Sequence, residues 1–231
     1  HLFEGIVGYW PFDSDFKDYS GNGNDSGARG DAFINGRSLQ LDGSGDYAFI
    51  GTGLGLSAES SFTMSGWFKV DPQENEGMIF GCETGEWPQS YIYIDGGHQL
   101  DYKLNKNGGP DNDTNITTVT PNQWYFIAVV SDYSNSNLDV YFDGSFAKRI
   151  TMPTEDIDAN RWMIGANASQ GTKRYFNGNI DDVQIRGALL SSKDVIALYN
   201  KGRAYIENGG ISVIYDTTNP AISSIEQINK S

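Results

Sequence analysis

The feature that most constrains this chain is a series of short runs in which apolar and polar residues alternate. The runs recur roughly every ten residues and are separated by glycine, asparagine and aspartate. Alternation with a period of two places successive side chains on opposite faces of a strand, so the series predicts an all-β antiparallel sandwich. The expected strands cover residues 5–12, 38–41, 47–50, 62–70, 78–82, 91–94, 99–104, 124–131, 138–142, 146–150, 161–165 and 178–186.

Turn residues support two of the joins between these strands. Asp143-Gly144 is a type I′ hairpin signal between residues 138–142 and 146–150. The sequence Asp95-Gly96-Gly97 lies in the same position between residues 91–94 and 99–104. Both pairs of strands are therefore predicted to be antiparallel.

One short helix is expected near the end of the periodic region, over residues 193–200. Ser191 and Asp194 form a weak capping box before it, and Gly202 suits its C-cap. The pattern changes after Gly202, so we expect a domain over residues 1–202 and a β-prone tail over residues 203–231. The alternating residues 210–215 of the tail leave three possibilities open: pairing with the domain's own sheet edge, donation of a strand to a neighbouring copy, or a linker.

Composition excludes several classes of protein. The 16 Lys and Arg residues against 30 Asp and Glu give a net charge of −14, which disfavours nucleic acid and anionic membrane surfaces. The single cysteine, Cys82, cannot form an intramolecular disulfide and is expected to be buried. No apolar run reaches the roughly 18 residues of a membrane span, and residues 1–10 lack the features of a signal peptide, so a secreted protein would be present here in its mature form.

A succession of motifs over roughly residues 5–202 points to a family. The motifs are VGYWPFD, DYSGNGND, SLQLDGSGDYAFI, SFTMSGWFK, NQWYFIAVVSD, LDVYFDG and FNGNIDDVQIRGALLSSKDVIALY. In this order they resemble the laminin-G-like, concanavalin A-like jelly-roll domains that are related to pentraxins. The resemblance implies two facing antiparallel sheets, non-catalytic binding or adhesion in secreted or cell-surface proteins, and often a bound calcium ion.

Calcium takes six to eight oxygen ligands, which a loop rich in turns can supply. Asp13 ends the first strand, and Asn22 and Asn24 lie in the glycine-rich loop after it. Asp181 lies in the last long strand, where alternation places it on the same face as apolar residues and predicts a need for a cation. If the first and last strands are neighbours, as the resemblance implies, Asp13 and Asp181 can share one calcium site. The alternative is that these residues form turns and hydrogen bonds only.

Sugar binding by a β-sandwich commonly uses exposed aromatic rings together with planar polar groups. Trp87 is the best candidate, because it lies in the turn-like sequence ETGEWPQS with Glu86 and Gln89 beside it. Tyr133, in SDYSNSN, is a second aromatic residue that we expect to be exposed. The alternative is that Trp87 covers the core at a sheet edge.

An enzyme is not expected. Glycoside hydrolysis needs two carboxylates across a glycosidic bond, and TEDIDAN at residues 154–160 lacks the Glu-x-Asp-x-x-Glu arrangement of laminarinase-like enzymes. The two histidines are His1 and His98, and His98 lies in a predicted hairpin turn. Neither a GxSxG motif nor a histidine cluster is present.

Five Asn-x-Ser/Thr sequons are candidate glycosylation sites, of which we select Asn112, Asn115 and Asn167; the others are Asn24 and Asn229. Unmodified asparagine-rich loops explain them equally well.

These observations predict a non-catalytic, extracellular, calcium-stabilised module that binds a glycan or another extracellular protein. The alternative is a subunit of an extracellular filament, in which copies of the chain associate through the donated tail.

Overall fold

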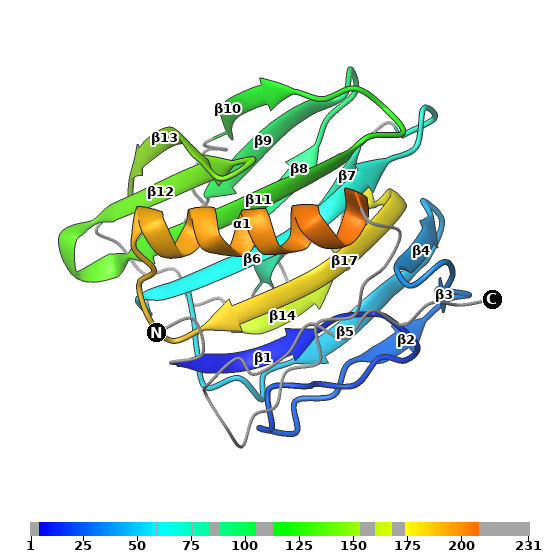
Figure 1. Cartoon of the computed structure of the whole chain (residues 1–231), viewed down its shortest axis with the longest axis horizontal. Coiled ribbons are helices and arrows are strands. Elements are labelled where there is room, and N and C mark those ends of the chain that lie inside the picture. The colour runs from blue at the N-terminus through cyan, green and yellow to red at the C-terminus, as the bar shows by residue number, and fades with distance from the viewer. Residues whose placement is uncertain are drawn as a thin grey trace.

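The structure is a computed structural model that describes residues 5–58, 60–74, 76–83, 88–104, 113–152, 160–167 and 174–207, with the backbone alone at 88–89 and 203–207. Two large antiparallel sheets make up most of it, as predicted (Figure 1). The first sheet contains β1 (Ile6–Trp10), β3 (Phe33–Ile34), β4 (Leu39–Asp42), β6 (Phe62–Val70), β11 (Trp124–Asp132), β12 (Asn137–Phe142), β13 (Ser145–Thr151) and β17 (Asn177–Arg186). The second contains β2 (Gly27–Arg29), β5 (Tyr47–Gly51), β7 (Gly77–Glu83), β8 (Pro88–Ile94), β9 (Gln99–Leu104), β10 (Asp113–Thr118) and β14 (Arg161–Ile164).

Two small elements complete the β structure. A two-stranded sheet pairs β15 (Ala166–Asn167) with β16 (Arg174–Tyr175), and the 3-10 helix η1 (Tyr133–Asn135) joins β11 to β12. Both predicted hairpins are confirmed, because β8 pairs with β9 and β12 pairs with β13. Asp143 and Gly144 both have positive φ angles, of 46° and 75°, as a type I′ turn requires.

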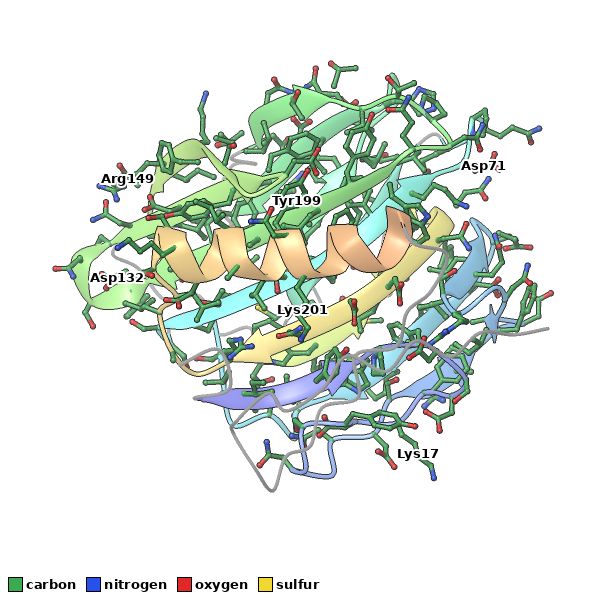
Figure 2. All side chains as sticks on the ribbon, viewed as in Figure 1. Lys17, Asp71, Asp132, Arg149, Tyr199 and Lys201 are labelled. Atoms are coloured by element: carbon green, nitrogen blue, oxygen red, sulfur yellow. The ribbon has the colours of Figure 1, made fainter. Side chains whose placement is uncertain are left out.

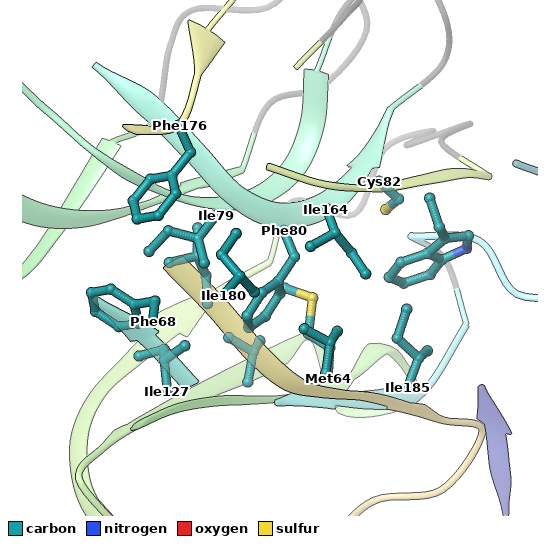
Figure 3. Packing of buried hydrophobic residues seen from close by; sticks show 14 of the residues in the cluster. Met64, Phe68, Ile79, Phe80, Cys82, Ile127, Ile164, Phe176, Ile180 and Ile185 are labelled. Atoms are coloured by element: carbon teal, nitrogen blue, oxygen red, sulfur yellow. The ribbon is translucent and has the colours of Figure 1, made fainter. Parts of the chain in front are cut away.

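The hydrophobic core fills the space between the two sheets (Figure 3). Phe68 and Ile180 face it from the first sheet, and Phe80 and Ile164 face it from the second. Cys82 is fully buried in the same cluster, as predicted. Burial of this apolar surface is the main force that holds the two sheets face to face.

Strand β17 organises the first sheet. One of its edges pairs with β6, while its other edge is shared end to end by β4, over residues 177–180, and β1, over residues 183–186. A bulge lies between these two halves, where Asp182 has a φ angle of 50°. The bulge keeps Ile180, Val183 and Ile185 in the core, so Asp181 points to the opposite face. The prediction that Asp181 shares a face with Val183 is therefore wrong.

Helix α1 (Ser192–Glu207) lies across the outer face of the first sheet (Figure 1). The capping box is confirmed, because the backbone N–H of Ser191 donates to Asp194 and the backbone N–H of Asp194 donates to the Ser191 hydroxyl. The predicted C-cap is wrong: the helix continues through Gly202, which packs against Trp67. The predicted domain boundary after residue 202 consequently falls inside the helix, and tail residues 208–231 lie outside the described residues. In the described part of the chain no helix is both long and apolar enough to cross a membrane.

Candidate functional site

Two of the predicted calcium ligands meet where β1 and β4 approach the bulge of β17. Asp13 follows β1 and Arg37 precedes β4, and the Arg37 Nε lies 2.8 Å from Asp13 Oδ1. Asp181 is only 6% exposed, and its carboxylate accepts a hydrogen bond from the backbone N–H of Asp182 at 2.9 Å. Burial, together with the charges of Asp182 and Asp13, holds the pKa of Asp181 well above its usual value. We call this region the β17 junction.

Helix α1 contributes a cation to the β17 junction. Lys201 leaves the helix on the side of β17, whereas Tyr199 lies on the side of β11 (Figure 2). Burial lowers the pKa of Lys201 to about 8 despite the opposing charge of Asp182. Burial likewise raises the pKa of Asp182, which accepts a hydrogen bond of 2.5 Å from the Tyr9 hydroxyl. Acidic groups are therefore concentrated here, with Arg37 and Lys201 as partial counter-charges.

The other two predicted calcium ligands lie at the opposite end of β1. The Asn22 side-chain amide donates to the carbonyl of Ile6 at 2.9 Å, and that of Asn24 donates to the carbonyl of Val7 at 2.8 Å. Since β1 meets the bulge at its Trp10 end, these amides fix the glycine-rich loop to the start of the strand. The structure thus brings Asp13 and Asp181 together but leaves Asn22 and Asn24 apart from them.

The predicted sugar-binding residues fall largely outside the described side chains. Trp87 and Glu86 are not among the described residues, and only the backbone of Gln89 is described, within β8. Tyr133 differs from the prediction, since its ring is half-buried against the core.

The predicted glycosylation sites also differ in their surroundings. Asn112 lies outside the described residues, and Asn115 is exposed on the edge strand β10. Asn167 is only 1% exposed in β15. An acceptor amide needs to reach the surface, so the folded chain does not present Asn167 for modification.

A separate carboxylate group was not identified in the sequence. Single oxygens of Asp31, Asp42 and Asp46 all lie within 4.8 Å of one another. Asp46 is buried and accepts a hydrogen bond from the backbone N–H of Asp31 at 2.8 Å. Burial and the neighbouring Asp31 raise the pKa of Asp46 to about 6.

The outer face of the second sheet carries a group of aromatic side chains. Strand alternation directs Tyr47 and Phe49 of β5, and Tyr91 and Tyr93 of β8, away from the core. Tyr175 of β16 joins them, with its ring centroid 6.4 Å from that of Tyr47. These five rings are defined here as the aromatic face. Tyr91 and Tyr93 are buried, whereas Tyr47, Phe49 and Tyr175 are half-buried.

Charged side chains surround the buried tyrosines of the aromatic face. The Arg174 Nη1 donates to the Tyr91 hydroxyl at 2.7 Å, and the same guanidinium pairs with Glu76. Lys103 Nζ lies 3.4 Å from Asp113 Oδ1 and 6.0 Å from the ring centroid of Tyr93. Each of these charges has a partner within the protein, so this part of the face is a satisfied polar network.

Two further arginines lie over Phe49, one of the half-buried rings of the aromatic face. The guanidinium carbons of Arg29 and Arg161 each lie 5.4 Å from the ring centroid of Phe49. Arg161 Nη1 is 3.7 Å from Oε1 of Glu83, a carboxylate that is fully buried. The sequence does hold a signal for this face, because Tyr91 and Tyr93 alternate with isoleucine, but it gives no indication that both arginines meet at Phe49.

Comparison with known proteins supports the fold. The sequence model of the concanavalin A-like lectin/glucanases superfamily matches residues 42–196. Among solved structures, three that are similar concern botulinum neurotoxin: a type DC binding domain in complex with SialylT (17% identity), one in complex with rat synaptotagmin II (16%), and a type C structure concerned with cell entry through two ganglioside molecules (18%). Each has a TM-score of 0.70, with 87% of this chain and 52% of the other covered.

At these identities the likeness establishes the fold alone. This chain spans about half the length of the neurotoxin structures it matches. A search among curated proteins found no match.

Proposed function

We propose that this chain, which belongs to the concanavalin A-like lectin/glucanases superfamily, is a non-catalytic module that binds carbohydrate on the outer face of its second sheet. The observation that carries this proposal is the aromatic face. Its half-buried rings offer partly accessible apolar surfaces on which a sugar can stack, and charged and amide groups lie beside them to select hydroxyl groups.

The two outer faces of the sandwich differ in a way that supports this location. Helix α1 covers the outer face of the first sheet, where Val195 and Leu198 pack against Trp67 and Phe126. Within the described residues no helix lies over the second sheet. The rings of the aromatic face therefore have no helix over them in the described part of the chain, although the most exposed aromatic residues of the two sheets, Phe33 and Phe146, lie on the first sheet.

The carboxylates on the second sheet support binding rather than hydrolysis. Glycoside hydrolysis needs one carboxylic acid and one carboxylate that both face the same bond. Here Asp113 pairs with Lys103, Glu83 faces Arg161, and Asp101 accepts a hydrogen bond from the Asn115 side chain at 3.0 Å. Groups that are occupied in this way are poorly placed to exchange protons with a substrate.

Partners of the structurally similar neurotoxin domains agree with a binding role. One of them is bound to SialylT, another to synaptotagmin II, and the type C toxin depends on two ganglioside molecules. By analogy, we propose that this module acts outside the cell on a glycan, with an extracellular protein as the second class of partner.

Affinity electrophoresis through gels that contain immobilised polysaccharides tests the proposal. Tyr47→Ala and Trp87→Ala should each reduce retention at least tenfold, because the rings supply the stacking surface, and the unfolding midpoint of each variant shows that it is still folded at the assay temperature. Phe146→Ala is the matched control: Phe146 is 56% exposed on β13 of the first sheet. Loss of retention in the control, or none in the two variants, would contradict the proposal.

Calcium remains a proposal for the β17 junction, with Asp13 and Asp181 as protein ligands. The high pKa of the buried Asp181 supports a need for positive charge there. The side-chain amides of Asn22 and Asn24 are bound to β1, so a four-residue site does not fit, and Arg37 competes for Asp13. The ion would act only by joining β1 to β17.

The filament alternative depends on tail residues that lie outside the described residues. The alternative would be favoured if the mass of the protein in solution rose with protein concentration. Removal of residues 208–231 should then return the mass to that of a monomer.

A further inference from the structure

We infer that Arg29, Phe49 and Arg161 form a subsite for the carboxylate group of an acidic sugar. This inference rests on the proposed function and specifies the class of glycan. The subsite lies on the part of the aromatic face around the half-buried Phe49, where β2, β5 and β14 lie side by side.

The two arginines approach one aromatic ring from the strands on either side of it. Because both guanidinium carbons lie 5.4 Å from the Phe49 centroid, they are separated by no more than twice that distance. Cation–π attraction offsets part of their mutual repulsion. In the inferred subsite the sugar carboxylate lies beside the ring, between these two charges.

These arginines differ from other arginines of the chain in how they are neutralised. Arg37 and Arg149 hold carboxylates at 2.8 and 2.6 Å, and Arg174 pairs closely with Glu76. Arg161 approaches Glu83 only to 3.7 Å, beyond hydrogen-bond distance. Arg29 donates one hydrogen bond, from Nη1 to the carbonyl of Ala28 at 3.1 Å, and within the described residues no carboxylate pairs with it.

A guanidinium has five N–H donors, so both arginines retain donors for an external acceptor. In a chain with a net charge of −14, these two arginines are a local positive site, because the charge of Arg29 has no carboxylate partner within the described residues and only that of Arg161 is offset, by the buried Glu83. Their planar groups suit the planar carboxylate of a uronic or sialic acid.

Gly27 makes the arrangement possible. It lies directly opposite Phe49 in the β2–β5 pair, and a Cβ atom at this position would come within 3.2 Å of Arg29 Nη1. The other atom within 4 Å is also part of the Arg29 guanidinium. A β-branched side chain at residue 27 would therefore compete with the Arg29 guanidinium for the space beside Phe49 without removing its charge.

The test compares acidic glycans with their uncharged methyl esters. Polygalacturonate and immobilised sialyllactose are the probes, each paired with its methyl-esterified form, in affinity electrophoresis and biolayer interferometry. We expect at least one acidic probe to bind at least tenfold more tightly than its ester, because the ester loses the charge-assisted hydrogen bonds. Arg29→Ala and Gly27→Val should each remove most of this difference.

Two controls separate the subsite from general charge and from misfolding. Lys148→Ala removes an exposed positive charge from β13 of the first sheet and should leave binding unchanged. Gly27→Val should keep the wild-type unfolding midpoint, since it moves only a flexible side chain. Arg161→Ala is less suitable as a primary variant, because it leaves the buried Glu83 without its nearby cation.

The outcomes distinguish this inference from the proposed function. Equal binding of acid and ester, with no effect of Gly27→Val, overturns the carboxylate subsite while carbohydrate binding stands. A second result also overturns the subsite: dextran sulfate binds more tightly than both carboxylate probes, and Gly27→Val binds it as tightly as the wild type does. Binding would then depend on negative charge in general. Failure to bind any of these probes or any neutral polysaccharide overturns both.

Discussion

Single residues decide where the polar groups of this sandwich lie. Alternation alone places Asp181 on the core side of its strand, but the bulge with Asp182 at positive φ reverses its direction. A sequence pattern shows the strand but not the extra residue, since a bulge is fixed by tertiary pairing with β6, β4 and β1. Asp13 and Asp181 lie near each other because their strands are neighbours, and their shared calcium site stays a prediction.

Gly202 provides a test of how closely α1 packs. In an isolated helix, replacing glycine with alanine stabilises by about 1 kcal/mol. Here the added Cβ would come within 2.1 Å of Trp67 Nε1, so we expect Gly202→Ala to lower the free energy of unfolding by about 1–2 kcal/mol. Urea denaturation of the wild type and the variant measures this change in the free energy of unfolding. Asn200→Ala, at an exposed helix position, should be neutral or stabilising, and a stabilised Gly202→Ala would show that the contact is absent.

Asp46 should make stability depend on pH. Its pKa is about 6 in the folded chain and 3.8 when unfolded, so between these values the folded state binds more protons. The free energy of unfolding should therefore fall as pH rises from about 4 to 6, by up to about 3 kcal/mol from this group. Asp46→Asn should flatten that slope in denaturation curves taken across this range. An unchanged slope would mean that Asp46 ionises normally.

At the scale of elements, most strands follow from the pattern and a few do not. Strands β6 and β9 have the predicted bounds, since their alternation is regular and their ends coincide with turns. Strand β10 is not among the strands that the sequence predicts, because its residues are almost all polar and show no apolar alternation. The helix is longer than predicted, since contact with Trp67 outweighs the tendency of Gly202 to end it.

The sheet edges are built in a way that discourages pairing with other chains. Strands β3 and β2, at one side of the sandwich, have two and three residues. Strands β13 and β10, at the other side, each contain a register shift, and β13 also exposes Lys148 and Arg149. Short, bulged and charged edges are typical protection against strand addition. This protection favours the binding module over the filament subunit.

Calcium is expected to act on the junction of β1, β4 and β17. If the ion binds there, the melting temperature in excess calcium should be roughly 5–10 °C higher than the melting temperature in chelator, as expected for a ligand that binds only the native state. Asp181→Asn should lose this response, whereas Asp139→Asn, on β12, should keep it. Identical melting curves of the wild type with and without chelator would reject calcium at this site.

At the scale of the whole molecule, the sandwich has one face covered by a helix and one face that carries aromatic residues and arginines. The sequence predicts the two layers, because the alternation of apolar and polar residues within each strand indicates which face of that strand is buried. Alternation in β8 indicates that its tyrosines share a face, but it does not show which residues join them, because Phe49, Tyr91, Arg29 and Arg161 come from four strands that only the sheet order brings together. Residue 87 remains a sequence-based prediction for the same function.

Backbone amide chemical shifts, recorded during titration with a polysaccharide that the protein retains, test the location of binding most directly. We predict that the largest shifts occur in β5, β8 and β14, around Tyr47, Phe49 and Arg161, while the amides of α1 and β11 remain unchanged. Shifts centred on α1 and the first sheet, or spread evenly over both sheets, would contradict binding on the outer face of the second sheet.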